Sequence, residues 1–400
     1  CGFSFLSWRG ILMGNQNLGR FLLLLLLHFW VKINPAVIAF TSVVNLQQPS
    51  KRMVNLHGHI SLRLTRRGIS ESKVRLPEPP PDPNKLLSEE QVEEKAQQLV
   101  DWWRGKSNVF CITGAGLSTE SGIPDYRGHE GSYHRGHKPV IHQQYMESEY
   151  QRQRYWGRSM IGWSKFSDAK PNKGHVALAN LERIGCLGVS MEDQPSFYRP
   201  EDEDEFYFSS GQPRKLAIMT QNVDYLHEQA GSKAVLHLHG RGHIVKCMNC
   251  GRRQDRTEFT NELKTMNEQW LEDAIRGYEE SDLRADGDAV VKDVDYANVH
   301  IPNCAHCNKG FWKTDVVFFG DAVPKHRVNI CQEAVENADG ILVVGSSLAV
   351  HSAFRHVRIA NEKGIPIAIL NVGETRAEVE GLDNILKIEA PAGTTLELCY

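Results

Sequence analysis

The chain has 400 residues, 41% of them hydrophobic, with 46 Lys and Arg against 49 Asp and Glu, for a formal net charge of −3. This length is enough for one large domain or two modest ones, each with a buried core. General nucleic-acid binders are strongly basic, so the near-neutral charge balance argues against that class of protein. Four of the nine cysteines form two C-x-x-C pairs, which indicates metal binding in a reducing compartment rather than a disulfide framework.

The N-terminal leader has a composition typical of a targeting segment. Residues 1–70 contain Arg and Lys but no Asp or Glu, as in a mitochondrial transit peptide. The apolar run 21–31 instead fits a secretory signal, and it is shorter than the roughly 20 residues of a membrane-spanning helix. We favour the mitochondrial matrix, because secretion would oxidise the paired cysteines. The chain begins with Cys, so we expect initiation at Met13 or Met53.

The first predicted elements follow a proline-rich linker, 76–84, which ends a leader region of residues 1–84. Ser88 and the acids after it predict a helix that continues to Trp103. The apolar run 109–112 predicts a buried strand, followed by a glycine turn and a helix. This arrangement brings backbone N–H groups to a phosphate. The turn alone is a weak signal, because the dinucleotide fingerprint needs a third glycine and a downstream acid; a tight turn in another α/β fold is the alternative.

The segments after the glycine turn include a candidate binding motif and two helices. The sequence GIPDYR at residues 122–127 combines a rigid turn, a carboxylate and a guanidinium, which could hold a second polar part of the same ligand. The Gly- and His-rich residues 128–142 predict a loop that covers the site. Helices are expected at 150–163 and 171–184, and the acid-rich segment 190–213 is expected to be an exposed insertion.

Four more apolar runs predict buried strands, at residues 216–219, 234–238, 341–344 and 366–370. Each run is followed by small or polar residues: Gln221, Asn222 and Asp224; His239; Gly345, Ser346 and Ser347; Asn371, Val372 and Gly373. In an open parallel sheet the carboxyl ends of the strands form the ligand crevice. His239 is the candidate base there, since an imidazole can take a proton near neutral pH. The pattern predicts an α/β protein with a Rossmann-like parallel sheet.

The paired cysteines predict a structural zinc site. Cys247, Cys250, Cys304 and Cys307 supply four thiolates with the spacing of a tetrahedral Zn²⁺ centre. The interval between the pairs exceeds the roughly 15 to 20 residues of a zinc ribbon, so we interpret its charged part as an insertion. A redox dithiol is the alternative. With four sulfur ligands the metal would hold a small domain together without contacting substrate.

From residue 85 to residue 398 the chain resembles the sirtuins, NAD-dependent protein deacylases. The resemblance is carried by these residues, in order: Gly114-Ala115-Gly116, residues 122–127, Gln221-Asn222-Val223-Asp224, His239-Gly240, the four cysteines, Phe319-Gly320-Asp321, Gly345-Ser346-Ser347 and Asn371-Val372. Residues 152–156, 316–321 and 365–376 are most similar to the class II mitochondrial branch, which includes a lipoamidase and ADP-ribosyltransferase.

The resemblance implies a domain organisation. The NAD-binding domain would comprise residues 85–240 and 314–400, and residues 241–313 would form the inserted zinc-binding domain. Residues 128–170 would add the cofactor loop and helices of the small domain. NAD and one structural zinc are the expected cofactors.

The resemblance also assigns roles to individual residues. For NAD these are Gly114, Ala115 and Gly116 at the pyrophosphate; Thr119, Asp125, Tyr126 and Arg127 at the nicotinamide ribose end; Gln221 at a ribose hydroxyl; Asn222 and Asp224 at nicotinamide; and Gly345, Ser346, Ser347, Asn371, Val372, Gly373 and Ala392 at adenosine. Catalysis is assigned to His239, as general base on a ribose hydroxyl, together with Asn222. The products would be nicotinamide, free lysine and an O-acyl-ADP-ribose.

For the acylated lysine, the family pattern points to two groups of residues. Val316, Phe318 and Gly320 would form an extended edge that takes the substrate backbone by strand addition. Tyr155 and Arg158 match a Tyr-x-x-Arg that binds an acyl carboxylate in one branch of the family. A guanidinium suits a carboxylate, so a true match predicts acidic acyl chains of the glutaryl type. Otherwise Tyr155 is a core residue and Arg158 lies on the helix surface.

Three other functions compete with deacylation. Mono-ADP-ribosylation of protein would use the same site. A hydride-transferring dehydrogenase would share the glycine turn but lacks the usual glycine spacing. A zinc-ribbon nucleic-acid module would need a basic face, for which Lys246, Arg252, Arg253 and Arg256 provide a small one. The expected partners are acylated lysine side chains of mitochondrial proteins, without DNA or membrane, and the oligomeric state stays open.

Overall fold

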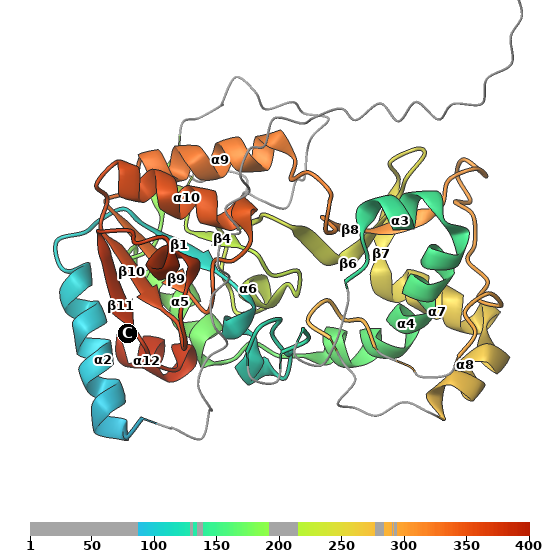
Figure 1. Ribbon diagram of the computed structural model, residues 1–400, viewed down its shortest axis with the longest axis horizontal. Coiled ribbons are helices and arrows are strands. Elements are labelled where there is room, and N and C mark those ends of the chain that lie inside the picture. The colour runs from blue at the N-terminus through green and yellow to red at the C-terminus, as the bar shows by residue number, and fades with distance from the viewer. Residues whose placement is uncertain are drawn as a thin grey trace, which may run out of the picture. The chain divides into compact units, whose positions relative to one another are not determined.

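The computed structural model describes residues 87–128, 131–133, 139–191, 215–276, 284–289, 291 and 294–400 (Figure 1). All of these residues belong to one compact unit, Glu71–Tyr400. The predicted leader, parts of the predicted cofactor loop and nearly all of the acidic insertion lie outside the described residues. Within the described part of the chain, no helix is long and apolar enough to cross a membrane.

The larger sheet has six parallel strands in the order β11-β10-β9-β1-β4-β5. Their bounds are β1 Val109–Thr113, β4 Ile218–Thr220, β5 Val235–His237, β9 Gly340–Val344, β10 Ile367–Leu370 and β11 Ile385–Ile388. Strands β1, β4 and β5, which come first in the chain, lie on one side of the β1/β9 boundary, and β9, β10 and β11 lie on the other. This is the strand order of dinucleotide-binding folds. The predicted α/β class is confirmed.

Helices cover both faces of this sheet, because its strands are apolar on both sides. Side chains alternate along β1, so Val109 and Cys111 face one core while Phe110 and Ile112 face the other. The first core includes residues of α2 (Glu89–Trp103), α5 (Lys173–Arg183) and α12 (Ala392–Leu398). The second includes residues of α9 (Lys325–Glu336), α10 (His351–Glu362) and α11 (Arg376–Val379). Figure 1 shows α9 and α10 side by side above the sheet.

A smaller module follows the sheet's β5 strand. Its antiparallel sheet has the order β7-β6-β8, with β6 Gly240–Cys247, β7 Arg253–Asp255 and β8 Trp312–Val316. Helices α3 (His142–Glu147), α4 (Glu149–Asp168), α7 (Arg256–Met266) and α8 (Glu268–Ile275) accompany it (Figure 1). Its aromatic core is built around Tyr145, Trp156, Phe259 and Trp312. Two short strands, β2 (Val189–Ser190) and β3 (Lys215–Leu216), pair antiparallel, and α6 spans Leu226–Gln229.

Local signals account for several of these boundaries. Ser88 and Gln91 form a capping box at the start of α2, and the side chain of Asn172 accepts from two N–H groups at the start of α5. The helix predicted directly after the glycine turn is wrong. The chain instead makes two 3₁₀ turns, Ala115–Leu117 and Thr119–Ser121, and Gly122 then adopts a left-handed φ of 81° that ends the helical path.

Candidate active site

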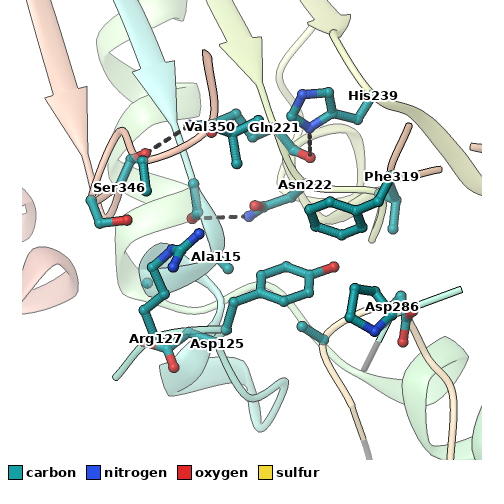
Figure 2. Close-up of a pocket in the computed structure, with 18 of the residues that line it drawn as sticks. Ala115, Asp125, Arg127, Gln221, Asn222, His239, Asp286, Phe319, Ser346 and Val350 are labelled. Carbon is teal, nitrogen blue, oxygen red and sulfur yellow. Dashed lines mark hydrogen bonds between the residues drawn. The ribbon is translucent and has the colours of Figure 1, made fainter. Parts of the chain in front are cut away.

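The main candidate site is a cavity of about 380 Å³ at the carboxyl ends of the large sheet's strands. Its volume lies in the range of small-molecule sites. Residues after β1, β4, β9 and β10 line it, together with the segment after β8 and a short segment of the small module. Figure 2 shows Ala115, Gln221, Asn222 and Ser346 around the strand ends, with Phe319 and Asp286 farther across the cavity.

Three glycines allow the loops after β1 and β9 to interlock at the boundary where the strand order reverses. A Cβ on Gly114 would lie 2.7 Å from the Cβ of Ser346, and one on Gly116 would lie 2.9 Å from the carbonyl oxygen of Gly345. Gly345 itself has a φ of 58°, and a Cβ there would lie 2.3 Å from the Leu117 nitrogen. No larger residue fits at these positions without a backbone shift. Ligands of doubly wound sheets bind at this boundary.

A hydrogen-bonded network fixes the polar side chains after β4. The Asn222 amide donates to the Gly114 carbonyl at 3.1 Å and to Ser118 Oγ at 3.0 Å, and Ser118 Oγ donates to Asp224 at 2.6 Å. Gln221 Nε2 donates to Ser346 Oγ at 2.7 Å. The network holds amide, hydroxyl and carboxylate groups against the cavity before any ligand binds. Ser118 is part of it but was missed by the sequence analysis, since it fell within the wrongly predicted helix.

His239 lies at the cavity wall with both ring nitrogens bonded. Its Nδ1 is 3.1 Å from the Gln221 carbonyl oxygen, which can only accept, so Nδ1 carries the proton and donates (Figure 2). Nε2 is therefore the acceptor in the neutral ring, and it lies 2.8 Å from Ser352 Oγ. Burial lowers the pKa of His239 to about 4, and the charge of Arg327 acts in the same direction. At neutral pH the ring is therefore uncharged, with Nε2 as its basic nitrogen.

The Asp125–Arg127 segment contributes charge to the same cavity. Asp125 and Arg127 both line it, and the Asp125 carboxylate accepts from the Gly128 N–H at 2.8 Å. The Arg127 guanidinium lies 5.1 Å from the ring centre of Tyr133 and extends on the same side as Ala115 (Figure 2). These groups fit a dinucleotide that carries a pyrophosphate at its centre and an amide at one end. The Arg127 cation beside the glycine turn suits the pyrophosphate, and the Asn222 amide and the Asp224 carboxylate suit the terminal amide.

The end of β8 and the segment after it form the opposite wall. Val316, Phe318 and Gly320 line the cavity, and the Val317 N–H donates to the His239 carbonyl at 2.8 Å. The His142 N–H donates to the Phe319 carbonyl at 2.9 Å, which ties this wall to the start of α3. Tyr155 also lines the cavity, and its hydroxyl shares a 2.8 Å hydrogen bond with Thr314 Oγ1.

Four predicted ligand residues lie outside the cavity lining: Thr119, Arg158, Gly373 and Ala392. The Thr119 hydroxyl donates to the Gly116 carbonyl at 2.9 Å. Arg158 is neither on the helix surface nor at the cavity, because it is buried and paired with Asp288 at 2.8 Å. Ala392 begins α12 and packs against the core on that face of the sheet. The remaining predicted NAD residues, from Gly114 to Val372, line the cavity.

Two cavity residues carry no sequence signal of their own. Asp286 belongs to the charged interval between the cysteine pairs, where the sequence predicts an insertion, and it lines the cavity. Ser352 lies in the first turn of α10 and has no motif around it, yet it reaches the base. Only the folded chain brings residues so far apart in sequence together.

The four cysteines converge in the small module, with their sulfur atoms all within 4.8 Å of one another. The distance from Cys247 Sγ to Cys307 Sγ is 3.7 Å, and that from Cys250 Sγ to Cys304 Sγ is 3.8 Å. A tetrahedron with Zn–S bonds of about 2.3 Å has S···S edges of about 3.8 Å. The donor set fits one structural zinc ion.

Two of the four basic residues near this centre make contacts within the protein. Arg256 is buried, donates to the Gly242 carbonyl at 2.9 Å and to Ser159 Oγ at 2.8 Å, and stacks on Trp163. Arg253 lies 3.6 Å from Asp315. These contacts remove Arg256 from the basic face that a nucleic-acid module would need, which leaves Lys246, Arg252 and Arg253 as its members.

Comparison with known proteins places this cavity in a family. A model described as the Sir2 family matches residues 114–191 and 209–352, and the break between them falls in the acidic segment. NAD-dependent protein deacetylase 2 of Bradyrhizobium diazoefficiens is 41% identical over 282 residues, which cover 70% of this chain and 90% of that protein. NAD-dependent protein deacylase Sirt4 of Drosophila melanogaster is 41% identical over 289 residues, which cover 72% of this chain and 81% of that protein.

Solved structures share the fold. One structure, from work on the mechanism and regulation of Sir2 enzymes, has a TM-score of 0.53 and 26% sequence identity to this chain. The match covers 76% of this chain and 96% of the other protein's chain. A mutant Sir2 homologue in complex with ADP-ribose has a TM-score of 0.54 and 25% identity, with 76% and 94% covered. The matched ranges, the sequence identity and the common fold show that the chain belongs to the Sir2 family, the sirtuins, whose enzymes use NAD.

Proposed function

We propose that this sirtuin is a protein-lysine deacylase that releases nicotinamide and transfers the acyl group to ADP-ribose. One observation carries the proposal: an unprotonated His239 Nε2 faces a cavity that it shares with Asn222, Asp224 and the apolar wall of Val316 and Phe318. Base, amide pocket and apolar wall are the three parts that the reaction needs. The relatives' names, which include deacetylases and deacylases, agree with it.

The residues divide the reaction between them. NAD, when bound, supplies a ribose carbon that becomes electrophilic as nicotinamide departs. Asn222 and Asp224, held by Ser118 and Gly114, orient the nicotinamide end. His239 Nε2 would take the proton of a ribose hydroxyl, so that the hydroxyl oxygen bonds to the acyl carbon and the lysine nitrogen leaves as the free amine. The Gln221 carbonyl would support the resulting imidazolium by accepting from Nδ1. The Val316 to Gly320 wall would hold the substrate backbone by strand addition.

We further propose that the preferred acyl group carries no negative charge. Arg158, the residue expected to bind an acyl carboxylate, is neutralised by Asp288 away from the cavity lining. Asp286 is one of several carboxylates that line the cavity, and it lies near enough to Tyr155 for its charge to act on that residue, so it would repel a glutaryl-type chain there. Tyr155, Val316 and Phe318 supply apolar surface for an acetyl or lipoyl chain.

A third proposal concerns the branch of the family and the compartment. The acid-free leader and the similarity to Drosophila Sirt4 support a class II enzyme of the mitochondrial matrix, although the Bradyrhizobium deacetylase is equally similar. Expression of the full chain with a C-terminal fluorescent tag tests this, with a version lacking residues 1–70 as the control. Matrix fluorescence that requires the leader is expected, and leader-independent cytosolic fluorescence would contradict the proposal.

The products separate deacylation from ADP-ribosyl transfer. The purified protein is incubated with NAD labelled in the adenine and with an acetyl-lysine peptide, a lipoyl-lysine peptide or no peptide. Label in an O-acyl-ADP-ribose that appears only with an acyl peptide is expected. Label that moves onto protein without any acyl peptide would instead favour mono-ADP-ribosylation through the same ribose carbon.

A further inference from the structure

The base at the cavity wall has a hydroxyl partner that contributes nothing to the roles described so far. Ser352 is in the first turn of α10, whereas His239 follows β5, and their side chains meet across the cavity edge with Ser352 Oγ 2.8 Å from His239 Nε2. Ser352 also lines the cavity. A partner from a different element, placed on the one nitrogen that must accept a proton, is in a position to control that nitrogen.

We propose that Ser352 is a positioning residue, whose hydroxyl fixes the tautomer and the orientation of the His239 ring so that Nε2 is the base. The proposal rests on the proposed deacylase function for its catalytic consequence. Two contacts together fix the ring: Nδ1 donates to the Gln221 carbonyl at 3.1 Å, and Nε2 accepts from Ser352. With only the hydrogen bond from Nδ1 to Gln221, the ring could still tilt about that hydrogen bond, and Nε2 would move away from the position of the ribose hydroxyl.

The hydroxyl suits both protonation states of the ring. In the NAD-free protein it donates to the single lone pair of Nε2; when the ribose hydroxyl takes its place as donor to that lone pair, the Ser352 hydroxyl rotates, and it accepts from Nε2–H once the proton has moved to the ring. Hydrogen bonds to an ionised partner are about twice as strong as neutral ones. Ser352 therefore helps the charged ring more than the neutral one, in a place where burial otherwise opposes the charge.

The charged groups around His239 do not stabilise the protonated ring, so the Ser352 hydroxyl is the side-chain group that can. Arg327 on α9 is a cation and makes protonation of the ring harder. Asp321, after β8, lies 3.1 Å from His142 Nδ1, and Asp224 accepts from Ser118. Neither acid contacts His239 in the described part of the chain. A neutral hydroxyl favours the protonated ring, but it raises the pKa of His239 less than a carboxylate would.

Removal and conservative replacement of the hydroxyl test the proposal. In Ser352→Ala we expect kcat for nicotinamide release to fall about tenfold while the KM for NAD changes less than about twofold, since the hydroxyl acts on the base. Ser352→Thr keeps the hydroxyl and should retain most of the rate. Arg358→Ala, at an exposed position of the same helix, is the matched control.

A spectroscopic measurement on the NAD-free protein is independent of activity. In long-range ¹H–¹⁵N spectra of the imidazole, assigned with His239→Ala, loss of the hydrogen bond in Ser352→Ala should move the Nε2 resonance downfield, and Ser352→Thr should restore it. An unchanged Nε2 resonance, an unchanged kcat, a change in KM alone, or equal loss in the Thr variant would overturn the proposal. A wild-type protein without acyl-dependent nicotinamide release would contradict the deacylase function, while the resonance would still decide the role of Ser352.

Discussion

Arg158 and Asp288 form an ion pair at 2.8 Å in which the two side chains are only 5% and 3% exposed. The Arg158 Nε also donates to the Ala289 carbonyl at 2.9 Å. The pair therefore joins α4 to the segment that presents Asp286 to the cavity. Arg158 therefore holds the segment that carries Asp286 in place, although Arg158 itself does not line the cavity.

This pair predicts a large loss of stability when one partner is removed. Arg158→Met leaves Asp288 buried without its cation, so the free energy of unfolding should fall by about 3–5 kcal/mol. The double variant Arg158→Met, Asp288→Leu should recover most of that loss, because no uncompensated charge remains. Urea unfolding measures both, with the exposed Lys165→Met as control. A single variant as stable as the wild type would contradict the buried pair.

Asp286 predicts an effect on acyl selectivity. Asp286→Asn removes the carboxylate from the cavity, so kcat/KM for glutaryl-lysine relative to acetyl-lysine should rise about threefold, the size expected of a partly screened charge. Peptide assays with the two substrates measure the ratio, and Asp273→Asn, on the exposed side of α8, serves as control. A ratio that stays the same or falls would place the acyl chain away from Asp286.

His356 predicts a pH-dependent stability. Its side chain is fully buried in α10, neither ring nitrogen has a hydrogen-bond partner in the described structure, and burial lowers its pKa to about 4. Between pH about 6.5 and 4 the unfolded chain binds a proton there and the folded chain does not, so this residue reduces stability as the pH falls.

Replacement of His356 by Phe should therefore stabilise the protein, and more so at lower pH. The variant should lose less stability on acidification than the wild type, by up to about 1.4 kcal/mol per pH unit in that window. Urea unfolding at pH 7 and pH 5.5 measures the difference, with the exposed His300→Gln as control. An equal slope in wild type and variant would show that His356 protonates freely in the folded protein.

The four-cysteine centre predicts zinc-dependent folding of the small module. The protein should contain about one zinc ion per chain, and its removal by a chelator, or by Cys247→Ser, should lower the melting temperature and abolish deacylation. Cys186→Ser is the matched control, since Cys186 is a cysteine outside the cluster. Elemental analysis and thermal unfolding provide the readings. A metal-free protein with an unchanged melting temperature would contradict a structural role.

Much of the fold could be predicted from local patterns. Five strands of the large sheet have apolar runs bounded by turn residues, and each was predicted. The sixth, β11, was not, because Lys387 interrupts its apolar pattern and most of the strand is only partly buried. The 3₁₀ turns after β1 were also missed, since the sequence specifies a turn there but not how tightly the following residues coil.

The site was less accessible to sequence reasoning than the fold. Residues at strand ends could be named, because parallel strands bring their carboxyl ends together. Contacts between distant elements could not: the bond from Ser352 to His239, the position of Asp286, and the burial of Arg158 against Asp288 all depend on tertiary packing. The Tyr-x-x-Arg spacing says which residues share a helix face, but not which cavity that face adjoins.

The most direct test of the whole account is nicotinamide release from NAD by the purified protein, with and without acetyl- and lipoyl-lysine peptides, beside His239→Ala. The account predicts release that depends on an acyl peptide and falls at least a hundredfold in the variant, because Nε2 is the base. Thermal unfolding confirms that the variant is folded. Absence of release from a folded, zinc-loaded protein, or release that His239→Ala leaves unchanged, would contradict the assignment of this cavity as a deacylase site with His239 as its base.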